Sequence, residues 1–158
     1  GVFERFPKLK YIITESGCAW AGPMLKAPYA KNALAATIYE QHPPFTTNPT
    51  AAAFVKIFNE RAAKANLPDT MVDTQAAASY SAWQMLEAAV NATKSLDDKA
   101  MAQWLKANQV DTIQGRLRFN GLGNFGDDLL RVKQVQNGQW ITVWPRQWAA
   151  PGAKLITQ

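Results

Sequence analysis

Cysteine and histidine are almost missing from this chain, which contains one of each, Cys18 and His42. A single cysteine excludes a disulfide within the chain and every metal site that needs several thiolates. A single histidine excludes the histidine-rich zinc and iron sites. We expect His42, in the segment EQHPPF, to be a loop residue rather than a ligand or a base. No metal or other cofactor is therefore predicted.

Long hydrophobic runs and dense clusters of positive charge are also missing. No apolar run approaches the ~20 residues that a membrane-spanning helix needs. The net charge is +5, but the lysines and arginines are scattered, with no run of three. They form no aromatic-and-basic RNA motif and no zinc finger. We attribute the charge to solvated surface and predict no nucleic-acid partner.

The elements that the sequence does contain alternate between strands and helices. β-branched and apolar residues predict strands at 9–14 and 33–41, and Asn137-Gly138 predicts a hairpin between 129–136 and 139–145. Three- and four-residue spacing predicts helices at 49–66, 74–93 and 96–108. This order predicts an α/β fold.

Capping residues and helical spacing refine the three helices. Asn48 before Pro49 is expected to cap the first helix, and Asp73 or Thr74 the second. SLDD has the spacing of a capping box with Ser95 at the cap. Apolar stripes on these helices predict core positions for Trp83 and Trp104.

The stretch DTIQGRLRFNGLGNFGDD combines strand-like alternation at Ile113, Leu117 and Phe119 with a glycine-rich run. Gly121, Gly123 and Gly126 have the spacing of a nucleotide-binding loop, but a hairpin follows where that loop needs a helix. Asp127 and Asp128 alone do not supply a calcium loop. We therefore interpret residues 120–128 as a connector.

Glu15 and Trp20 are the first candidate site residues. Glu15 follows the strand 9–14, and ligands of open α/β sheets sit at the carboxyl ends of strands. Its carboxylate either points into a cleft or is a solvated turn residue. Trp20 either lines that cleft or packs locally. If their strands are adjacent, Glu15 and Glu40 could form a carboxylate pair; otherwise both lie at solvent-exposed strand ends.

From about Trp20 onward the chain resembles the C-terminal half of a periplasmic solute-binding protein of the branched-chain amino-acid class. The segments that carry the resemblance are NPTAAAFVKIFNERA, AAASYSAWQMLEAAVNATKSLDDKAMAQWLKAN and VDTIQGRLRFNGLGN. They present the family's motifs in the family's order: Tyr80 and Ala82, Ser95 to Asp97, then Thr112, Gly115, Phe119 and Gly123.

The resemblance implies a partial two-lobed, type I periplasmic-binding-protein fold with flavodoxin-like, Rossmann-like lobes. Residues 1–158 would be its C-terminal portion, with 1–41 and 128–148 in the second lobe and 42–127 in the first. The lobes would close by hinge motion at linkers near residues 41–49 and 120–128.

The implied function is that of a receptor, not an enzyme. It would bind an amino acid or related small organic acid in the bacterial periplasm and deliver it to an ABC permease. Glu15 would pair with a ligand ammonium, Trp20 would form an apolar wall, and Tyr80 would lie near the hinge in a binding or supporting role.

Two features of the sequence depart from the family. The family's N-terminal half is missing from this chain. The chain also starts at GVFERF without an initiator methionine, so we expect a processed or truncated chain. We also expect a dimer, a swapped arrangement or a completing segment. GVFERFPKLKYIITESGCAW additionally resembles a segment of metal-dependent amidohydrolases, which makes an amidohydrolase fragment the alternative function. A fragment without a ligand of its own is a third.

Overall fold

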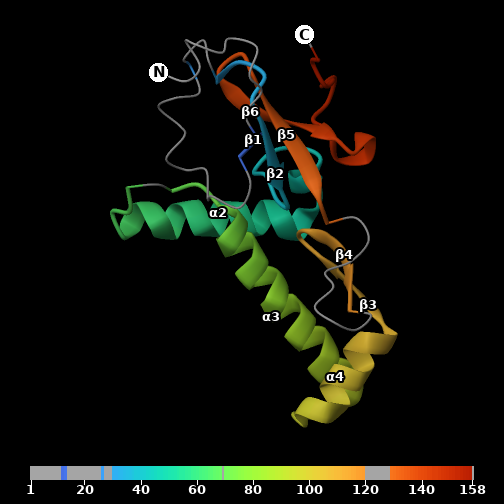
Figure 1. Cartoon of the computed structure of the whole chain (residues 1–158). Coiled ribbons are helices and arrows are strands. Elements are labelled where there is room, and N and C mark those ends of the chain that lie inside the picture. Colours follow the sequence, from blue (N-terminus) through green and yellow to red (C-terminus); the bar gives the residue numbers. More distant parts are fainter. Residues whose placement is uncertain (1–11, 14–25, 27–29, 69, 120–128, 158) are drawn as a thin grey trace.

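The computed structural model describes residues 12–13, 26, 30–68, 70–119 and 129–157, and the structural statements below concern these residues. A four-stranded sheet occupies one end of the molecule, and a helix pair with a two-stranded sheet occupies the other (Figure 1). Helix α2, Pro49–Lys64, runs between the two ends. The mixture of helices and sheets confirms the α/β class.

The larger sheet joins the beginning of the chain to its end. Its order is β1-β2-β5-β6, with β1 at Ile12–Ile13, β2 at Leu34–Thr37, β5 at Arg131–Gln136 and β6 at Gln139–Trp144. β1 and β2 are parallel, and the other two pairings are antiparallel. The β5–β6 hairpin confirms the Asn137-Gly138 prediction, since both turn residues have the positive φ that its turn type requires.

Three side-chain caps fix where the helices begin. Asn48 Oδ1 accepts from the Thr50 amide and starts α2, and Asp73 caps α3, Thr74–Thr93, as predicted. The third predicted helix, α4, is present, but its predicted cap, Ser95, was wrong. Asp97 Oδ1 accepts from the Ala100 amide, so α4 begins at Asp98 and spans Asp98–Ala107. Ser95 instead accepts from the Asp97 amide, which orients the true cap.

The smaller sheet is an unpredicted hairpin. β3, Gln109–Thr112, pairs antiparallel with β4, Gly115–Arg118, with Val110 opposite Leu117. The sequence had predicted a single strand from Ile113 onward. That prediction was wrong because Ile113 lies at the turn, where its side chain is 1% exposed and packs in the core.

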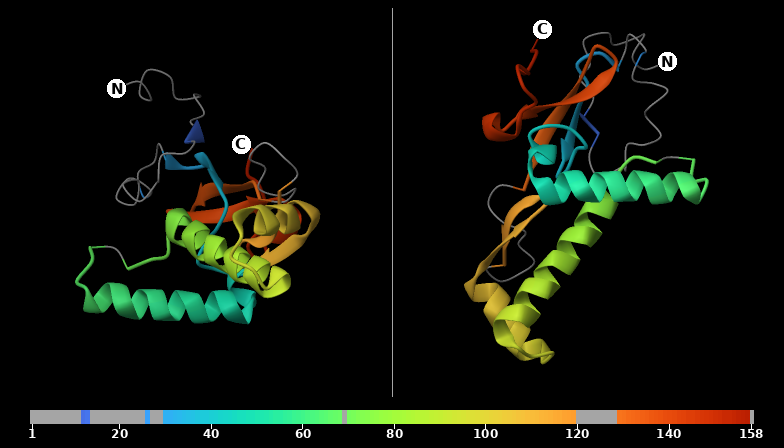
Figure 2. Two further views of the ribbon diagram at one scale, coloured as in Figure 1. Left: turned by 90° about the horizontal axis from the view of Figure 1, so that it is seen from below. Right: turned by 180° about the vertical axis from the view of Figure 1, so that it is seen from behind.

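Two buried clusters hold these elements together. The first lies where the larger sheet meets α2 and α3, and it is formed by Tyr39, Phe45, Ala51, Val72, Ala77 and Ile113. The second joins α3 to the β3–β4 hairpin through Met85, Val110 and Leu117, and Trp104 of α4 packs against it as predicted. Figure 2 shows from behind how α3 leads from the first region to the second.

The buried face of α3 differs from the predicted one. Small residues and a methionine line it: Ala77, Ser81, Met85 and Ala89. Trp83 is 69% exposed, so its predicted core position was wrong. The four-residue spacing of small side chains lets α3 approach its neighbours closely and turns Trp83 outward. In the part of the chain that the structure describes, no helix is both long and apolar enough to cross a membrane.

Candidate functional site

The carboxyl ends of β1 and β2 lie at one edge of the larger sheet, because the two strands are adjacent and parallel. Just past β2, Glu40 Oε1 accepts from the Thr37 hydroxyl at 2.7 Å and from Lys133 Nζ of β5, also at 2.7 Å. The side chains of Lys133 and Glu40 are only 12% and 16% exposed. The Lys133 ammonium also lies 5.1 Å from the centre of the Trp140 ring. The Glu40 carboxylate is therefore paired with a cation within the fold.

Arg131, the first residue of β5, is the most deeply buried charged side chain at this end, with 1% exposed. Its Nη1 donates to the carbonyl oxygens of Ile38 and Leu129 at 2.9 and 2.8 Å. Its Nη2 donates to the carbonyl oxygen of Gln114 at 2.6 Å. The three carbonyls come from the exit of β2, the entry to β5 and the β3–β4 turn. We call this group, Ile38, Gln114, Leu129 and Arg131, the Arg131 junction.

Aromatic rings enclose the guanidinium of Arg131. Its central carbon lies 4.0 Å from the Trp148 ring centre and 5.3 Å from that of Phe45. Phe45 lies in the 3-10 helix η3, Phe45–Thr47, and Trp148 in η4, Arg146–Trp148. The two ring centres are 4.8 Å apart. This site suits an arginine better than a lysine, because a planar guanidinium can lie flat against a ring while its N–H groups donate to several carbonyls in fixed directions.

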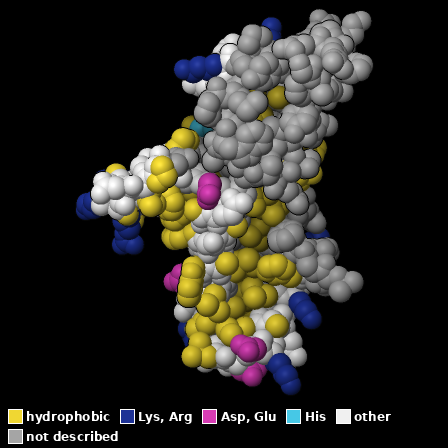
Figure 3. Space-filling view, turned by 60° about the vertical axis from the view of Figure 1, so that its left-hand side comes forward, with side chains coloured by type: hydrophobic (Ala, Val, Ile, Leu, Met, Phe, Trp, Pro, Cys, Tyr) yellow, Lys and Arg dark blue, Asp and Glu magenta, His cyan; other side chains and the backbone are white. Residues whose placement is uncertain are grey.

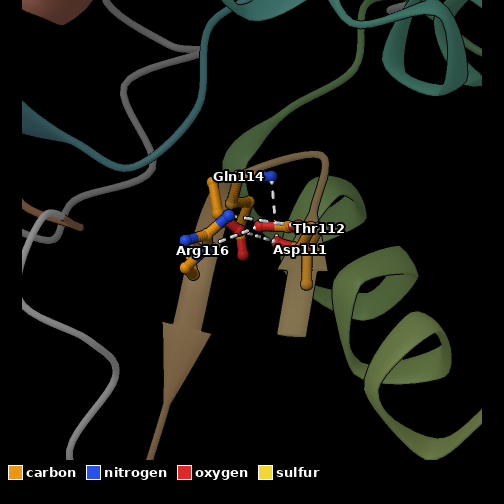
Figure 4. A network of polar contacts seen from close by, with 5 residues as sticks. Asp111, Thr112, Gln114 and Arg116 are labelled. Carbon is orange, nitrogen blue, oxygen red and sulfur yellow. Dashed lines mark hydrogen bonds and ion pairs between the residues drawn. The ribbon is translucent and has the colours of Figure 1, made fainter. Parts of the chain in front are cut away.

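The β3–β4 turn, which supplies the Gln114 carbonyl to this junction, is held by polar contacts of its own (Figure 4). The Thr112 hydroxyl donates to the Gly115 carbonyl at 2.8 Å and accepts from the backbone N–H of Gln114 at 3.2 Å. Gly115 has φ +114°, and a Cβ there would lie 3.1 Å from both Arg131 Nη2 and Trp148 Cζ2. Glycine therefore permits both the turn and the close approach. On the outer side, Arg116 pairs with Asp111 at 2.8 Å, and this partner raises the pKa of the guanidinium.

Tyr39 and His42 belong to the segment that leaves β2. Tyr39 is 2% exposed and packs edge-on against Phe45, and burial, with a smaller effect of Glu40, raises its pKa to about 12. His42 Nδ1 lies 2.8 Å from the Pro43 carbonyl oxygen, and Nε2 lies 3.5 Å from the Thr142 hydroxyl. His42 is a loop residue, as predicted.

The structure places only part of the predicted site. Glu15 and Trp20 lie outside the described residues, as does the 120–128 connector. Tyr80 lies in the second turn of α3, half-buried, and its ring stacks on Phe54 with centres 4.3 Å apart. The two strands that precede Glu15 and Glu40 are adjacent, which was the condition for a carboxylate pair. Glu15 lies outside the described residues, and Glu40 is bound to Lys133.

Arg131 and Gln114 were not anticipated as important residues. In LLRVKQVQ, Arg131 resembles the solvent-facing member of an alternating strand. The only local signal is that it shares a strand face with Val135, which is 2% exposed. Within the described ranges, no three His, Cys, Asp or Glu side chains are grouped so that they could hold a metal ion.

Comparison with known families gives one match. Residues 9–139, well over half of the chain, match the family described as periplasmic binding protein. No curated protein matches the chain significantly. The amidohydrolase resemblance gains no support from the comparison, and of its residues the structure describes only Ile12 and Ile13. Family membership implies a solute-binding role and an extracytoplasmic location, in a family that is generally not enzymatic. The chain belongs to the periplasmic binding protein family.

Proposed function

We propose that the chain is the solute-binding component of an ABC importer for amino acids or related small organic acids. The match of residues 9–139 to the periplasmic binding proteins carries the proposal. The parallel pairing of β1 and β2 supports it, because the segments that leave both strands start at one sheet edge. That edge is where α/β folds bind ligands.

Glu15 is our candidate for the residue that pairs with a ligand ammonium. It follows Ile13, the last residue of β1, by two positions. The other acid at this edge, Glu40, is already bound to Lys133 and Thr37. A charged hydrogen bond of the proposed kind contributes roughly 1.5–3 kcal/mol. Trp20 is proposed as the apolar wall beside it.

Tyr80 completes the proposed set, with a supporting role favoured over direct ligand contact. Its ring is stacked on Phe54 of α2, and both pack against the first buried cluster. A side chain that is committed to this packing can fix the position of α3 relative to α2. A ligand contact would need only the part of Tyr80 that remains accessible.

We propose two lobes with the boundaries given by the family resemblance, residues 1–41 and 128–148 in one and 42–127 in the other. The strands β1, β2, β5 and β6 share one sheet, which supports placing them together. The chain passes between this sheet and the helices twice, after β2 and before β5. Closure of the lobes on a solute would bend these two connections.

We also propose that the helical part packs against a completing half or a second copy. Hydrophobic side chains gather over that part of the face in Figure 3. The exposed large apolar residues of the helices and the loops beside them are Ile57, Leu67, Met71, Trp83, Leu86 and Leu96. Exposed apolar surface of this extent is typical of interaction sites.

A thermal-shift panel tests the proposed function. Purified protein is heated with each of the common amino acids and a set of aliphatic and aromatic carboxylic acids. A solute present at about 100 times its Kd stabilises the folded state by about 2.7 kcal/mol, which raises the unfolding temperature clearly. A panel without any shift would count against the receptor. Stoichiometric zinc in metal analysis would favour the amidohydrolase alternative.

A further inference from the structure

We infer that Arg131 is a positioning residue that sets the orientation of the four-stranded sheet relative to the helices. The connectivity makes this position special. Among the described elements, two connections join the sheet to helices α2 to α4 and the β3–β4 hairpin, one after β2 and one before β5. Arg131 belongs to the sheet and donates to a carbonyl in each connection, Ile38 in the first and Leu129 in the second.

A third bond extends this contact to the helical part. Gln114, whose carbonyl accepts from Arg131 Nη2, lies at the tip of the β3–β4 turn and is 3% exposed. The neighbouring Ile113 amide donates to Gln84 Oε1 of α3 at 3.0 Å. The turn is thereby fixed to α3 on one side and to Arg131 on the other. One guanidinium thus connects the sheet, both crossings and the helical part.

The energetics favour a role in orientation over a role in stability alone. The bond to Gln114 is buried, and those to Ile38 and Leu129 are partly buried. A carbonyl that loses its donor in such surroundings is costly, so the arrangement that satisfies all three is preferred over rotated ones. The rings of Phe45 and Trp148 restrict the guanidinium plane, so its three bonds point in fixed directions. A rotation of the sheet against the helices would break at least one of them.

The consequence for binding rests on the proposed function. If the two connections are the hinge of a receptor, Arg131 limits the range of lobe orientations before the solute arrives. Binding then has less conformational entropy to remove, and affinity benefits. Loss of Arg131 would broaden that range without removing any residue that we propose to contact the solute.

Spin-label distance measurements on the protein without added solute test the inference. Labels are attached to Gln139→Cys on β6 and Lys106→Cys on α4, both exposed positions, in a Cys18→Ser background. We expect Arg131→Met to broaden the distance distribution. Arg131→Lys keeps the positive charge but loses the planar set of guanidinium N–H donors, so it should give a distribution of intermediate width.

Two further variants separate orientation from stability. Met85→Ala creates a cavity in the second buried cluster, away from the junction, and should lower the unfolding temperature with an unchanged distribution. Gly115→Ala places a Cβ 3.1 Å from Arg131 Nη2 and should broaden the distribution or shift its centre with Arg131 itself intact. Gly115→Ala and Arg131→Lys carry the test if Arg131→Met does not fold.

The inference is overturned if Arg131→Lys and Gly115→Ala both give the wild-type distribution, whatever their unfolding temperatures. It is also overturned if Met85→Ala broadens the distance distribution as much as Arg131→Lys and Gly115→Ala do, because the width would then depend on overall stability and not on the Arg131 junction. No solute enters the measurement, so failure of the proposed function would leave this result interpretable.

Discussion

The Glu40–Lys133 ion pair should stabilise the fold much more than a surface pair does. Its atoms are 2.7 Å apart, and its side chains are 16% and 12% exposed. Lys133→Met leaves the Glu40 carboxylate with only the Thr37 hydroxyl, and Glu40→Gln leaves a largely buried ammonium beside the Trp140 ring. Each single substitution removes a charged hydrogen bond, so we expect each to cost about 1.5–3 kcal/mol of unfolding free energy.

The double variant isolates the pair itself. Removal of both charges leaves no unpaired ion, so Glu40→Gln/Lys133→Met should be more stable than the sum of the single losses predicts. The expected coupling energy is about 1.5–3 kcal/mol, and it should change little between low and high salt, since largely buried pairs are weakly screened. Urea unfolding followed by tryptophan fluorescence measures all four proteins.

Asp111–Arg116 provides a matched control. Its atoms are 2.8 Å apart, but the side chains are 76% and 64% exposed. The same cycle with Asp111→Asn and Arg116→Met should give a smaller coupling that declines with salt. Equal couplings at the two sites, or a Glu40–Lys133 coupling that disappears in salt, would refute the reasoning from burial.

Three further predictions concern stability. Asp97→Ala should cost about 1 kcal/mol and Asp98→Ala less, because only Asp97 accepts from the Ala100 amide; equal losses in urea unfolding would contradict the assigned cap. The pKa of Tyr39 is raised from 10.0 to about 12, so the stability that its neutral phenol contributes is complete below pH 10 and is lost as the pH rises toward 12. Tyr39→Phe should therefore flatten the decline of unfolding free energy at alkaline pH. An unchanged decline would contradict the raised pKa. Gly115→Ala should cost more than about 1 kcal/mol because φ is +114°, and a neutral result would contradict the turn geometry.

Features set by adjacent residues were predicted correctly. The caps Asn48 and Asp73 and the Asn137-Gly138 hairpin depend on a few neighbouring backbone groups, so the sequence specifies them locally. The third cap shows where this reasoning fails. Ser95 matches a capping-box pattern, but Asp97, two residues later, offers the same kind of acceptor and is the one that caps. Pattern alone cannot choose between two good caps.

Features set by tertiary contacts were missed. Arg131 is buried because the β2 exit, η4 and the β3–β4 turn converge on it, and all three lie far from it in the sequence. Trp83 was expected in the core because it shares an apolar stripe with Leu86, but the alanine side of α3 is the one that packs. When a helix carries apolar residues on two faces, the partner element decides which face is buried.

The candidate site also combines features that the sequence could predict with features that depend on tertiary contacts. Residues after parallel strands could be predicted to share a sheet edge, and the adjacency of β1 and β2 agrees with this. The pairing of Glu40 with Lys133 depends on which strand lies next to β2, and the sequence offered no way to identify β5 as that neighbour. Without that pairing, Glu15 and Glu40 look like equivalent candidates.

Titration calorimetry tests the central claim most directly, that the chain binds a small amino or organic acid through the edge near β1. Wild-type protein, Glu15→Gln and Glu40→Gln are each titrated with the amino acids and carboxylic acids that stabilise it. We expect an amino acid to bind, Glu15→Gln to weaken binding by at least ~1 kcal/mol, and Glu40→Gln to leave the affinity unchanged.

A change much smaller than ~1 kcal/mol for Glu15→Gln would contradict the assignment of Glu15 as the ammonium partner. Binding of aliphatic or aromatic acids alone would also contradict that assignment and would make Trp20 the residue to substitute next. Absence of binding to every solute tested would contradict the receptor function itself.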